Sequence, residues 1–293
     1  MSMLLTSADV LRSTNARHPI AAMISPTCAT KQTRRLLLSQ SITPLCVRRI
    51  NLALVKCKDR PRGYFAEHFT KLNLFALQGL NAAFYLDSDV VVLKNTDAVL
   101  DQMLGNPRIQ EARTPQGCME RYAGRRWLNT GVWGVKPNAT LLKGLLTWLG
   151  TGQTKCFDGD QSAAEQYLML NGAAKRKLED FFLLHVGYNM KANQMPEQCL
   201  RRHKLTPADL NIVHFSGRQK PYELLDYSPR RPISSREKIR GQSTVNRISQ
   251  SRPYHAAIVH SPLVDRAARL WMASWNKWNA TLHVMPPSGF HVR

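Results

Sequence analysis

One stretch, residues 84–95, constrains the fold of this chain more than any other. Two acidic residues, Asp87 and Asp89, lie between the apolar runs 82–86 and 90–93, which predict buried strands. Acids in such surroundings lower stability unless a cation pairs with them. Side chains at i and i+2 of an extended chain point to the same side, so both carboxylates can reach one ion. Because carboxylates suit Mn²⁺ and Mg²⁺, the stretch predicts a divalent-metal site, and a solvated acidic turn is the alternative.

A histidine and a lysine later in the chain extend this hypothesis. Residues 212–222 place His214 at the end of a short apolar run, followed by Gly217 and by Lys220 before a proline. A neutral imidazole can serve as a third metal ligand. Glycine lets a backbone amide approach a phosphate, and lysine can neutralise a diphosphate. A strand-end histidine beside a solvated loop is the alternative reading.

The hydrophobic pattern alternates between short strands and helices, which predicts an α/β fold with a mixed, mostly parallel sheet flanked by helices. The expected strands cover residues 3–7, 19–25, 50–55, 82–86, 90–93, 127–135, 181–186 and 212–215. The expected helices cover residues 30–39, 66–77, 97–104, 141–149 and 162–170. Apolar residues at helical spacing over residues 262–282 predict a tail helix that docks on the core.

The chain is strongly basic, with a net charge of +21 from 41 Lys and Arg against 20 Asp and Glu. Such a charge favours anionic partners. Residues 228–254 contain seven basic residues and one acid, without periodicity. We therefore expect a domain at residues 1–225, a basic flexible linker or insert at 226–254, and a helical segment at 255–293. The linker is the expected contact for a polyanion or a membrane surface.

The six cysteines form no Cys-x-x-Cys pair, which argues against a structural zinc site. Their dispersal suits free thiols, and secretory disulfides stay open as the alternative. No signal peptide and no apolar run that could span a bilayer is found. These absences predict a cytoplasmic protein, with the Golgi lumen as the alternative if the N-terminus is incomplete.

Seven segments, in this order, resemble the glycosyltransferase family that includes glycogenin, family 8. They are Leu-Leu-Thr-Ser at 4–7, Thr-Lys-Leu at 70–72, Tyr-Leu-Asp-Ser-Asp at 85–89, Leu-Asn-Thr-Gly-Val at 128–132, Phe-Asp-Gly-Asp-Gln at 157–161, Gly-Tyr-Asn at 187–189 and His-Phe-Ser-Gly-Arg-Gln-Lys-Pro-Tyr at 214–222. The resemblance implies a GT-A (Rossmann-like) fold and a retaining transfer of a hexosyl group from a UDP-sugar. A glycan, polyol, lipid or protein hydroxyl is the expected acceptor, Mn²⁺ the expected ion with Mg²⁺ as an alternative, and a homodimer stays open.

The resemblance also implies roles for individual residues. Asp87, Asp89 and His214 look like the metal ligands, and Gly217 and Lys220 look like the diphosphate clamp. Asp160 looks like the nucleophile, if the reaction uses one. The remaining implied contacts to the donor are Leu4, Thr6 and Ser7 at the nucleobase, Ser88 at the ribose, Lys71 and Arg62 at the sugar or phosphate, and Asn129, Thr130, Asp158, Asp160 and Gln161 around the sugar. Asp158, Gln161 and Lys71 are the further catalytic candidates.

Three departures from the family stand out. About one helix is missing between the first two expected strands, and Val10 stands where an aromatic residue is usual. The chain begins at its first expected strand, so an anchor could precede it. No tyrosine lies between Asn189 and His214, which argues against self-glucosylation of the glycogenin kind.

Two other functions compete with transfer. One is an inactive, glycosyltransferase-like module that binds anions. The other is a haloacid-dehalogenase-like phosphatase, because residues 87–91 fit the pattern D-x-D-x-[TV]. That family usually has its motif near the start of the domain, whereas here over eighty residues precede it.

Overall fold

The computed structural model describes residues 2–26, 29–51, 55–58, 63–115, 128–156, 159–171, 180–192, 196–216 and 261–282. The chain divides into two compact units. Unit 1 comprises Met1–Asn15, Ser88–Asn95 and Val186–Arg293, and unit 2 comprises Ala16–Asp87 and Thr96–His185. The boundary between the units therefore passes between Asp87 and Ser88. The predicted linker at 226–254 lies outside the described residues.

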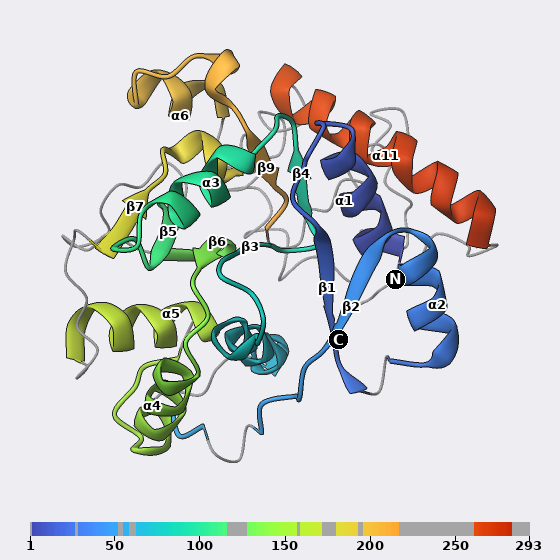
Figure 1. The fold of residues 1–293 in the computed structure, drawn as a ribbon. Coiled ribbons are helices and arrows are strands. Elements are labelled where there is room, and N and C mark those ends of the chain that lie inside the picture. The colour runs from blue at the N-terminus through green and yellow to red at the C-terminus, as the bar shows by residue number, and fades with distance from the viewer. Residues whose placement is uncertain are drawn as a thin grey trace, which may run out of the picture. The chain divides into compact units, whose positions relative to one another are not determined.

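Unit 2 begins with a parallel strand–helix–strand motif (Figure 1). Strand β1 (Ile20–Ile24) pairs in parallel with β2 (Ile42–Cys46), and α2 (Lys31–Ser39) connects them. Thr30 caps α2, because its side chain accepts a hydrogen bond from the Thr33 amide. Strand β1 and helix α2 confirm the predictions for residues 19–25 and 30–39. Strand β2 was missed, and residues 50, 51 and 55, within the predicted strand 50–55, have no regular structure.

The central sheet of unit 2 has the strand order β3-β6-β5-β7. These strands are β3 (Ala83–Leu86), β6 (Leu128–Val135), β5 (Glu111–Pro115) and β7 (Phe181–Leu183). Strand β6 is antiparallel to both of its neighbours, whereas β5 and β7 are parallel. All eight residues of β6 are buried, including the polar side chains of Asn129 and Thr130. Gly134 is required there because a Cβ would meet the Ala112 Cβ at 2.6 Å.

Helices cover this sheet and enclose the core of unit 2. They are the 3₁₀ helix η3 (Gly63–Ala76), α3 (Asp97–Gly105), α4 (Ala139–Gly150), α5 (Asp160–Glu165) and the π-helix η4 (Gln166–Asn171). In the core, Phe75 of η3 meets Trp133 of β6 edge to face, with ring centroids 5.1 Å apart. The predicted helices of this unit are thus present. The helix predicted at 66–77 is a 3₁₀ helix, and the one predicted at 162–170 continues as a π-helix from Gln166.

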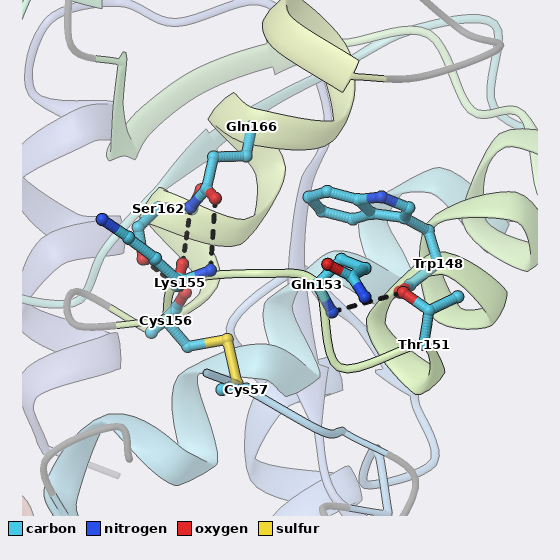
Figure 2. Close-up of a disulfide and its surroundings, with 9 residues drawn as sticks. Cys57, Trp148, Thr151, Gln153, Lys155, Cys156, Ser162 and Gln166 are labelled. Atoms are coloured by element: carbon cyan, nitrogen blue, oxygen red, sulfur yellow. Dashed lines mark hydrogen bonds between the residues drawn. A yellow bond between two sulfur atoms is a disulfide. The ribbon is translucent and has the colours of Figure 1, made fainter. Parts of the chain in front are cut away.

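A disulfide links Cys57 to Cys156 across 99 residues of sequence (Figure 2). Cys156 is fully buried, and its carbonyl accepts a hydrogen bond from the Gly159 amide just before α5. The bond therefore fixes the segment that leads into α5. The expectation of free thiols is wrong for this pair, because sequence spacing does not reveal which distant cysteines meet. Among the described cysteines, Cys46 is free and exposed.

Unit 1 contains a three-stranded sheet of order β4-β9-β8. Strand β9 (Ile212–His214) is antiparallel to β4 (Val90–Val92) and parallel to β8 (Met190–Lys191). The short helices of this unit are η6 (Val186–Tyr188), α6 (Pro196–Arg202) and η7 (Pro207–Asp209). Over both units, three described strand pairs are parallel and three antiparallel, where the sequence predicted a parallel majority.

Two long helices pack together in unit 1 (Figure 1). Helix α11 (Pro262–Leu282) buries Trp271, Trp275 and Trp278, and the first two rings stack with centroids 4.8 Å apart. It confirms the predicted tail helix. Its partner is α1 (Ser2–Arg12), where the sequence predicted a strand at residues 3–7. That prediction is wrong: Leu5 and Ala8 lie on one face at helical spacing and are buried.

The described residues include no helix long and apolar enough to cross a membrane.

Removing the disulfide tests its contribution to the fold. We expect Cys57→Ala/Cys156→Ala to lower the free energy of unfolding by about 2–5 kcal/mol, because the bond closes a long loop in the unfolded chain. Urea denaturation measures the loss. Cys46→Ala is the matched control and should change stability by less than about 0.5 kcal/mol, because that thiol is exposed and forms no disulfide. Equal stability of the three chains would contradict the prediction.

Candidate functional site

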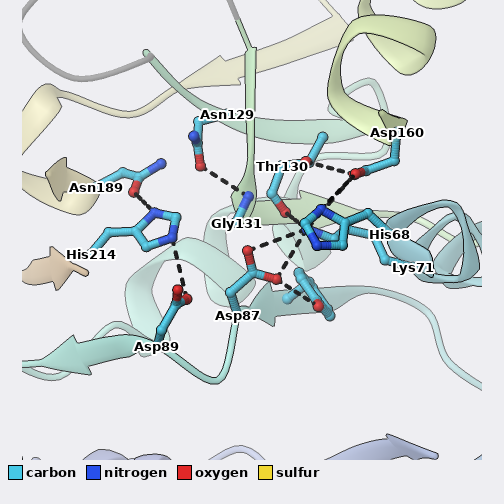
Figure 3. A network of polar contacts seen from close by, with 11 residues as sticks. His68, Lys71, Asp87, Asp89, Asn129, Thr130, Gly131, Asp160, Asn189 and His214 are labelled. Atoms are coloured by element: carbon cyan, nitrogen blue, oxygen red, sulfur yellow. Dashed lines mark hydrogen bonds and ion pairs between the residues drawn. The ribbon is translucent and has the colours of Figure 1, made fainter. Parts of the chain in front are cut away.

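In unit 1, the strand pair β4–β9 brings Asp89 to His214 (Figure 3). Asp89 directly precedes β4, and its carbonyl accepts a hydrogen bond from the Phe215 amide at 2.9 Å. His214 ends β9, opposite Val90 in the register. The His214 Nε2 atom lies 3.4 Å from the Asp89 Oδ1 atom. Two predicted ligands, 125 residues apart in the sequence, are therefore neighbours because their strands pair.

The buried Asn189 side chain orients the His214 ring. Its Oδ1 atom lies 2.8 Å from the Nδ1 atom of His214. An amide oxygen only accepts hydrogen bonds, so Nδ1 carries a proton, and in a neutral ring the lone pair of Nε2 would then face Asp89. A lone pair facing a carboxylate is unfavourable unless a cation or a proton lies between them. The donor set of imidazole nitrogen and carboxylate oxygen therefore fits a divalent cation.

In unit 2, Lys71 of η3 forms an ion pair with Asp87, which follows β3 (Figure 3). The Lys71 Nζ atom lies 3.0 Å from Asp87 Oδ1 and 3.3 Å from Oδ2. The Tyr85 hydroxyl donates a 2.8 Å hydrogen bond to the same Oδ1 atom. The Asp87 amide donates to the Gly131 carbonyl of β6 at 2.8 Å, which holds the backbone in place. The Asp87 carboxylate is thus oriented by groups from two neighbouring elements.

Asp160, the first residue of α5, lies on the other side of Lys71. Its Oδ2 atom is 3.7 Å from Lys71 Nζ and accepts a 2.7 Å hydrogen bond from the Thr130 hydroxyl. The half-exposed His68 approaches its Oδ1 atom to 3.9 Å. Gly159 precedes the helix with φ of +63°, a left-handed conformation that glycine adopts readily. This turn aims the carboxylate of Asp160 at Lys71 and Thr130.

Burial controls the electrostatics of this cluster. Burial raises the pKa of Asp160, although the Lys71 charge and the Thr130 hydrogen bond act in the opposite direction. Burial alone would lower the pKa of Lys71, but the charges of Asp160 and Asp87 outweigh it and raise that pKa. Burial and the Asp87 charge raise the pKa of Tyr85 well above its ordinary value. Lys71 therefore stays an ammonium ion, and Tyr85 stays a hydrogen-bond donor.

Other predicted site residues occupy varied positions. In unit 1, the Ser7 hydroxyl donates to the Ser88 carbonyl at 2.8 Å, Leu4 is half-buried, and Thr6 is fully buried. In unit 2, the buried Asn129 side chain accepts a hydrogen bond from the Gly131 amide. Their roles toward a donor stay predictions. Leu4, Thr6 and Ser7 belong to helix α1 and not to the predicted strand.

Gln161 is buried in α5 next to Asp160. The remaining candidates, Arg62, Asp158, Gly217 and Lys220, lie outside the described residues.

The sequence analysis assigns no role to three residues of these clusters, namely His68, Tyr85 and Asn189. Two of them lie inside segments that carried the family resemblance, at 85–89 and 187–189. Their position in those segments was the available signal. His68 lies one helical turn before Lys71, so spacing along a helix was the signal there.

No protein-family model and no curated protein matches the sequence. Solved structures do match. The galactosyltransferase LgtC, in complex with donor and acceptor sugar analogues, is 15% identical with a TM-score of 0.56, over 75% of this chain and 85% of that one. The apo form of the glycosyltransferase GlyE of Streptococcus pneumoniae TIGR4 is 14% identical with a TM-score of 0.52, over 98% of this chain and 62% of that one.

The bifunctional glycosyltransferase WbbM is also similar, at 10% identity and a TM-score of 0.51, over 92% of this chain and 50% of that one. At these identities the likeness shows the fold. The predicted α/β class is confirmed, and the chain has the GT-A glycosyltransferase fold.

Replacing Lys71 tests the electrostatics of unit 2. We expect Lys71→Met to lower the free energy of unfolding by about 3–5 kcal/mol, because Asp87 and Asp160 lose their buried counterion. The loss should grow as pH rises above 3.8, the ordinary pKa of Asp160. The folded chain then holds a proton that the unfolded chain releases, so rising pH favours unfolding. Urea denaturation at acidic and neutral pH measures both effects.

Lys277→Met is the matched control for this prediction. Lys277 also pairs with an aspartate, Asp9, at 3.0 Å, but its side chain is 60% exposed. Exposed pairs contribute less than about 1 kcal/mol. Equal losses in the two variants would contradict the importance of burial.

Proposed function

We propose that this chain is a retaining hexosyltransferase that uses a UDP-sugar and a divalent cation, Mn²⁺ or Mg²⁺. The observation that supports it most directly is the His214–Asp89 pair, with Asn189 orienting the ring, on a GT-A fold. Asp87 is the proposed third ligand. Only Ser88 separates it from Asp89, and a chain of that length keeps the two Cα atoms within about 7 Å of each other.

The residues then divide the work of transfer between them. Asp87, Asp89 and His214 hold the cation, which supplies Lewis-acid assistance to the departing diphosphate when bound. Asn189 keeps the Nε2 lone pair of His214 available as a ligand. Asp160 and Thr130 face the donor sugar. The bond between sugar C1 and the phosphate oxygen breaks with its electron pair on UDP, and the acceptor oxygen bonds to C1 and passes its proton to the departing diphosphate.

The buried Asp160 suits a reaction in which C1 becomes positively charged. A carboxylate close to such a carbon stabilises the charge or attacks the carbon directly. Retention through a covalent intermediate would make Asp160 the nucleophile, whereas front-face attack would leave it as an electrostatic partner. The fold likeness gives the phosphatase alternative no support.

The disulfide bears on the compartment in which the chain works. Disulfides persist in oxidising environments and are rare in the cytosol. Because Cys57 and Cys156 are joined, we favour an oxidising compartment such as the secretory lumen over the cytoplasmic expectation. Alkylation of thiols tests this choice. Thiols are trapped in intact cells and the chain is then unfolded in the presence of the reagent. In a cytosolic chain both cysteines would be reduced and labelled, whereas the disulfide would protect them in an oxidising compartment.

Loss of the proposed ligands tests the function. Transfer and hydrolysis are measured across a panel of UDP-sugars with Mn²⁺. We expect Asp89→Ala and His214→Ala to lower turnover by more than about 100-fold, because each removes a direct ligand of the cation. Asp265→Ala, which removes a partly exposed acid of α11, is the control and should keep full activity. Full activity in both ligand variants would overturn the site.

The same experiment addresses the anion-binding alternative. Binding of polyanions that falls steeply with salt, without any Mn²⁺-dependent turnover in the unaltered chain, would support that module instead.

Asn189 provides a separate test of metal binding. We expect Asn189→Ala to weaken Mn²⁺ binding by about 10- to 100-fold, because His214 loses the group that fixes its orientation. Titration followed by electron paramagnetic resonance measures the affinity. Asn211→Ala is the matched control, because among the described residues its side-chain amide donates to the Asp209 carbonyl and contacts no proposed ligand. Equal affinities of the two variants would argue against a positioning role for Asn189.

A further inference from the structure

Asp87 already binds a cation in this structure, namely the ammonium group of Lys71. Both carboxylate oxygens are within 3.3 Å of Lys71 Nζ, and Oδ1 also accepts a hydrogen bond from Tyr85. These are the same oxygens that the proposed metal site would use. A divalent cation and an ammonium ion repel each other, so a metal bound to Asp87 would weaken the pair between Asp87 and Lys71.

Asp160 offers Lys71 a second place to go. The two carboxylates share this ammonium group, which is 3.0 Å from the nearer oxygen of Asp87 and 3.7 Å from Asp160 Oδ2. The Lys71 side chain is 11% exposed, so water cannot readily replace a lost partner. The Thr130 hydroxyl holds Asp160 Oδ2 in position at 2.7 Å. A shift of about 1 Å along this line would bring Lys71 Nζ from 3.7 Å to within hydrogen-bonding distance of Asp160 Oδ2.

We propose that Lys71 transfers its ammonium group from Asp87 to Asp160 when a divalent cation binds Asp87. This inference rests on the proposed metal site. It makes Lys71 a positioning residue. When the metal binds, the Lys71 ammonium group moves to Asp160, and its charge holds the Asp160 carboxylate in place for the donor sugar. The metal and the donor then bind with positive coupling, because each favours the same position of Lys71.

A simpler electrostatic account predicts something different. If Lys71 stays where it is and acts only through its charge, removal of Lys71 and removal of Asp160 change metal affinity independently. If Lys71 moves, Asp160 compensates for the lost pair with Asp87, and the two removals are coupled. A double-mutant cycle separates these accounts, because it isolates the coupling from the single effects.

The experiment measures Mn²⁺ affinity by electron paramagnetic resonance for the unaltered chain, Lys71→Met, Asp160→Asn and the double variant. We expect Lys71→Met to tighten binding, because a competing cation is removed. The tightening should be at least about fivefold greater in the Asp160→Asn background, where Lys71 loses its second carboxylate partner and competes most strongly. Equal tightening in both backgrounds would overturn the transfer.

A crystal structure of the unaltered chain with Mn²⁺ provides a second test, which does not depend on the folding of any variant. We expect Lys71 Nζ to lie within hydrogen-bonding distance of Asp160 and away from Asp87. Retention of the Lys71–Asp87 pair in the loaded chain would overturn the transfer.

Asp89→Ala separates this inference from the function beneath it. If Mn²⁺ binds the unaltered chain and Asp89→Ala abolishes binding, the metal site stands, and an additive cycle rejects only the transfer of Lys71. If Asp89→Ala binds Mn²⁺ normally, the metal site and the transfer both fail.

Discussion

One buried and one partly buried carboxylate, which share one ammonium ion, set the main constraint in unit 2. Asp87 and Asp160 come from different elements, and Lys71 comes from a third. Burial of the acids without this cation would be strongly unfavourable, so β3, α5 and η3 must meet where these side chains meet. The glycine turn before α5, the Thr130 hydrogen bond and the disulfide that holds the preceding segment all serve this meeting.

In unit 1, the carboxylate of Asp89 is likewise placed next to a polar group, the buried His214 ring. His214 is 3% exposed and presents a nitrogen to Asp89, while Asn189 satisfies the other nitrogen. A ring that is held by a buried amide cannot turn away, so its Nε2 atom stays directed at the acid. Each unit thus contains an acid whose environment favours a cation.

Local sequence patterns predicted a helix or strand correctly where the burial of its apolar residues in the core determines its structure. The tail helix follows directly from the helical spacing of its apolar residues, and strand β6 from a strand-like run that Asn129, Thr130 and Gly131 interrupt. The pattern failed at residues 3–7, which form part of α1, because a short apolar run fits a strand and a buried helix equally. It also missed β2, whose proline and half-exposed residues give a weak strand signal.

The sequence by itself determined the chemical inventory: two acids at i and i+2, a strand-end histidine, and a lysine within a helical run. Tertiary structure decided the pairings. It placed Lys71 between Asp87 and Asp160, gave Asn189 to His214, and joined Cys57 to Cys156. Spacing reports which side chains share a face of one element, whereas contacts between distant elements depend on how their strands pair and their cores pack.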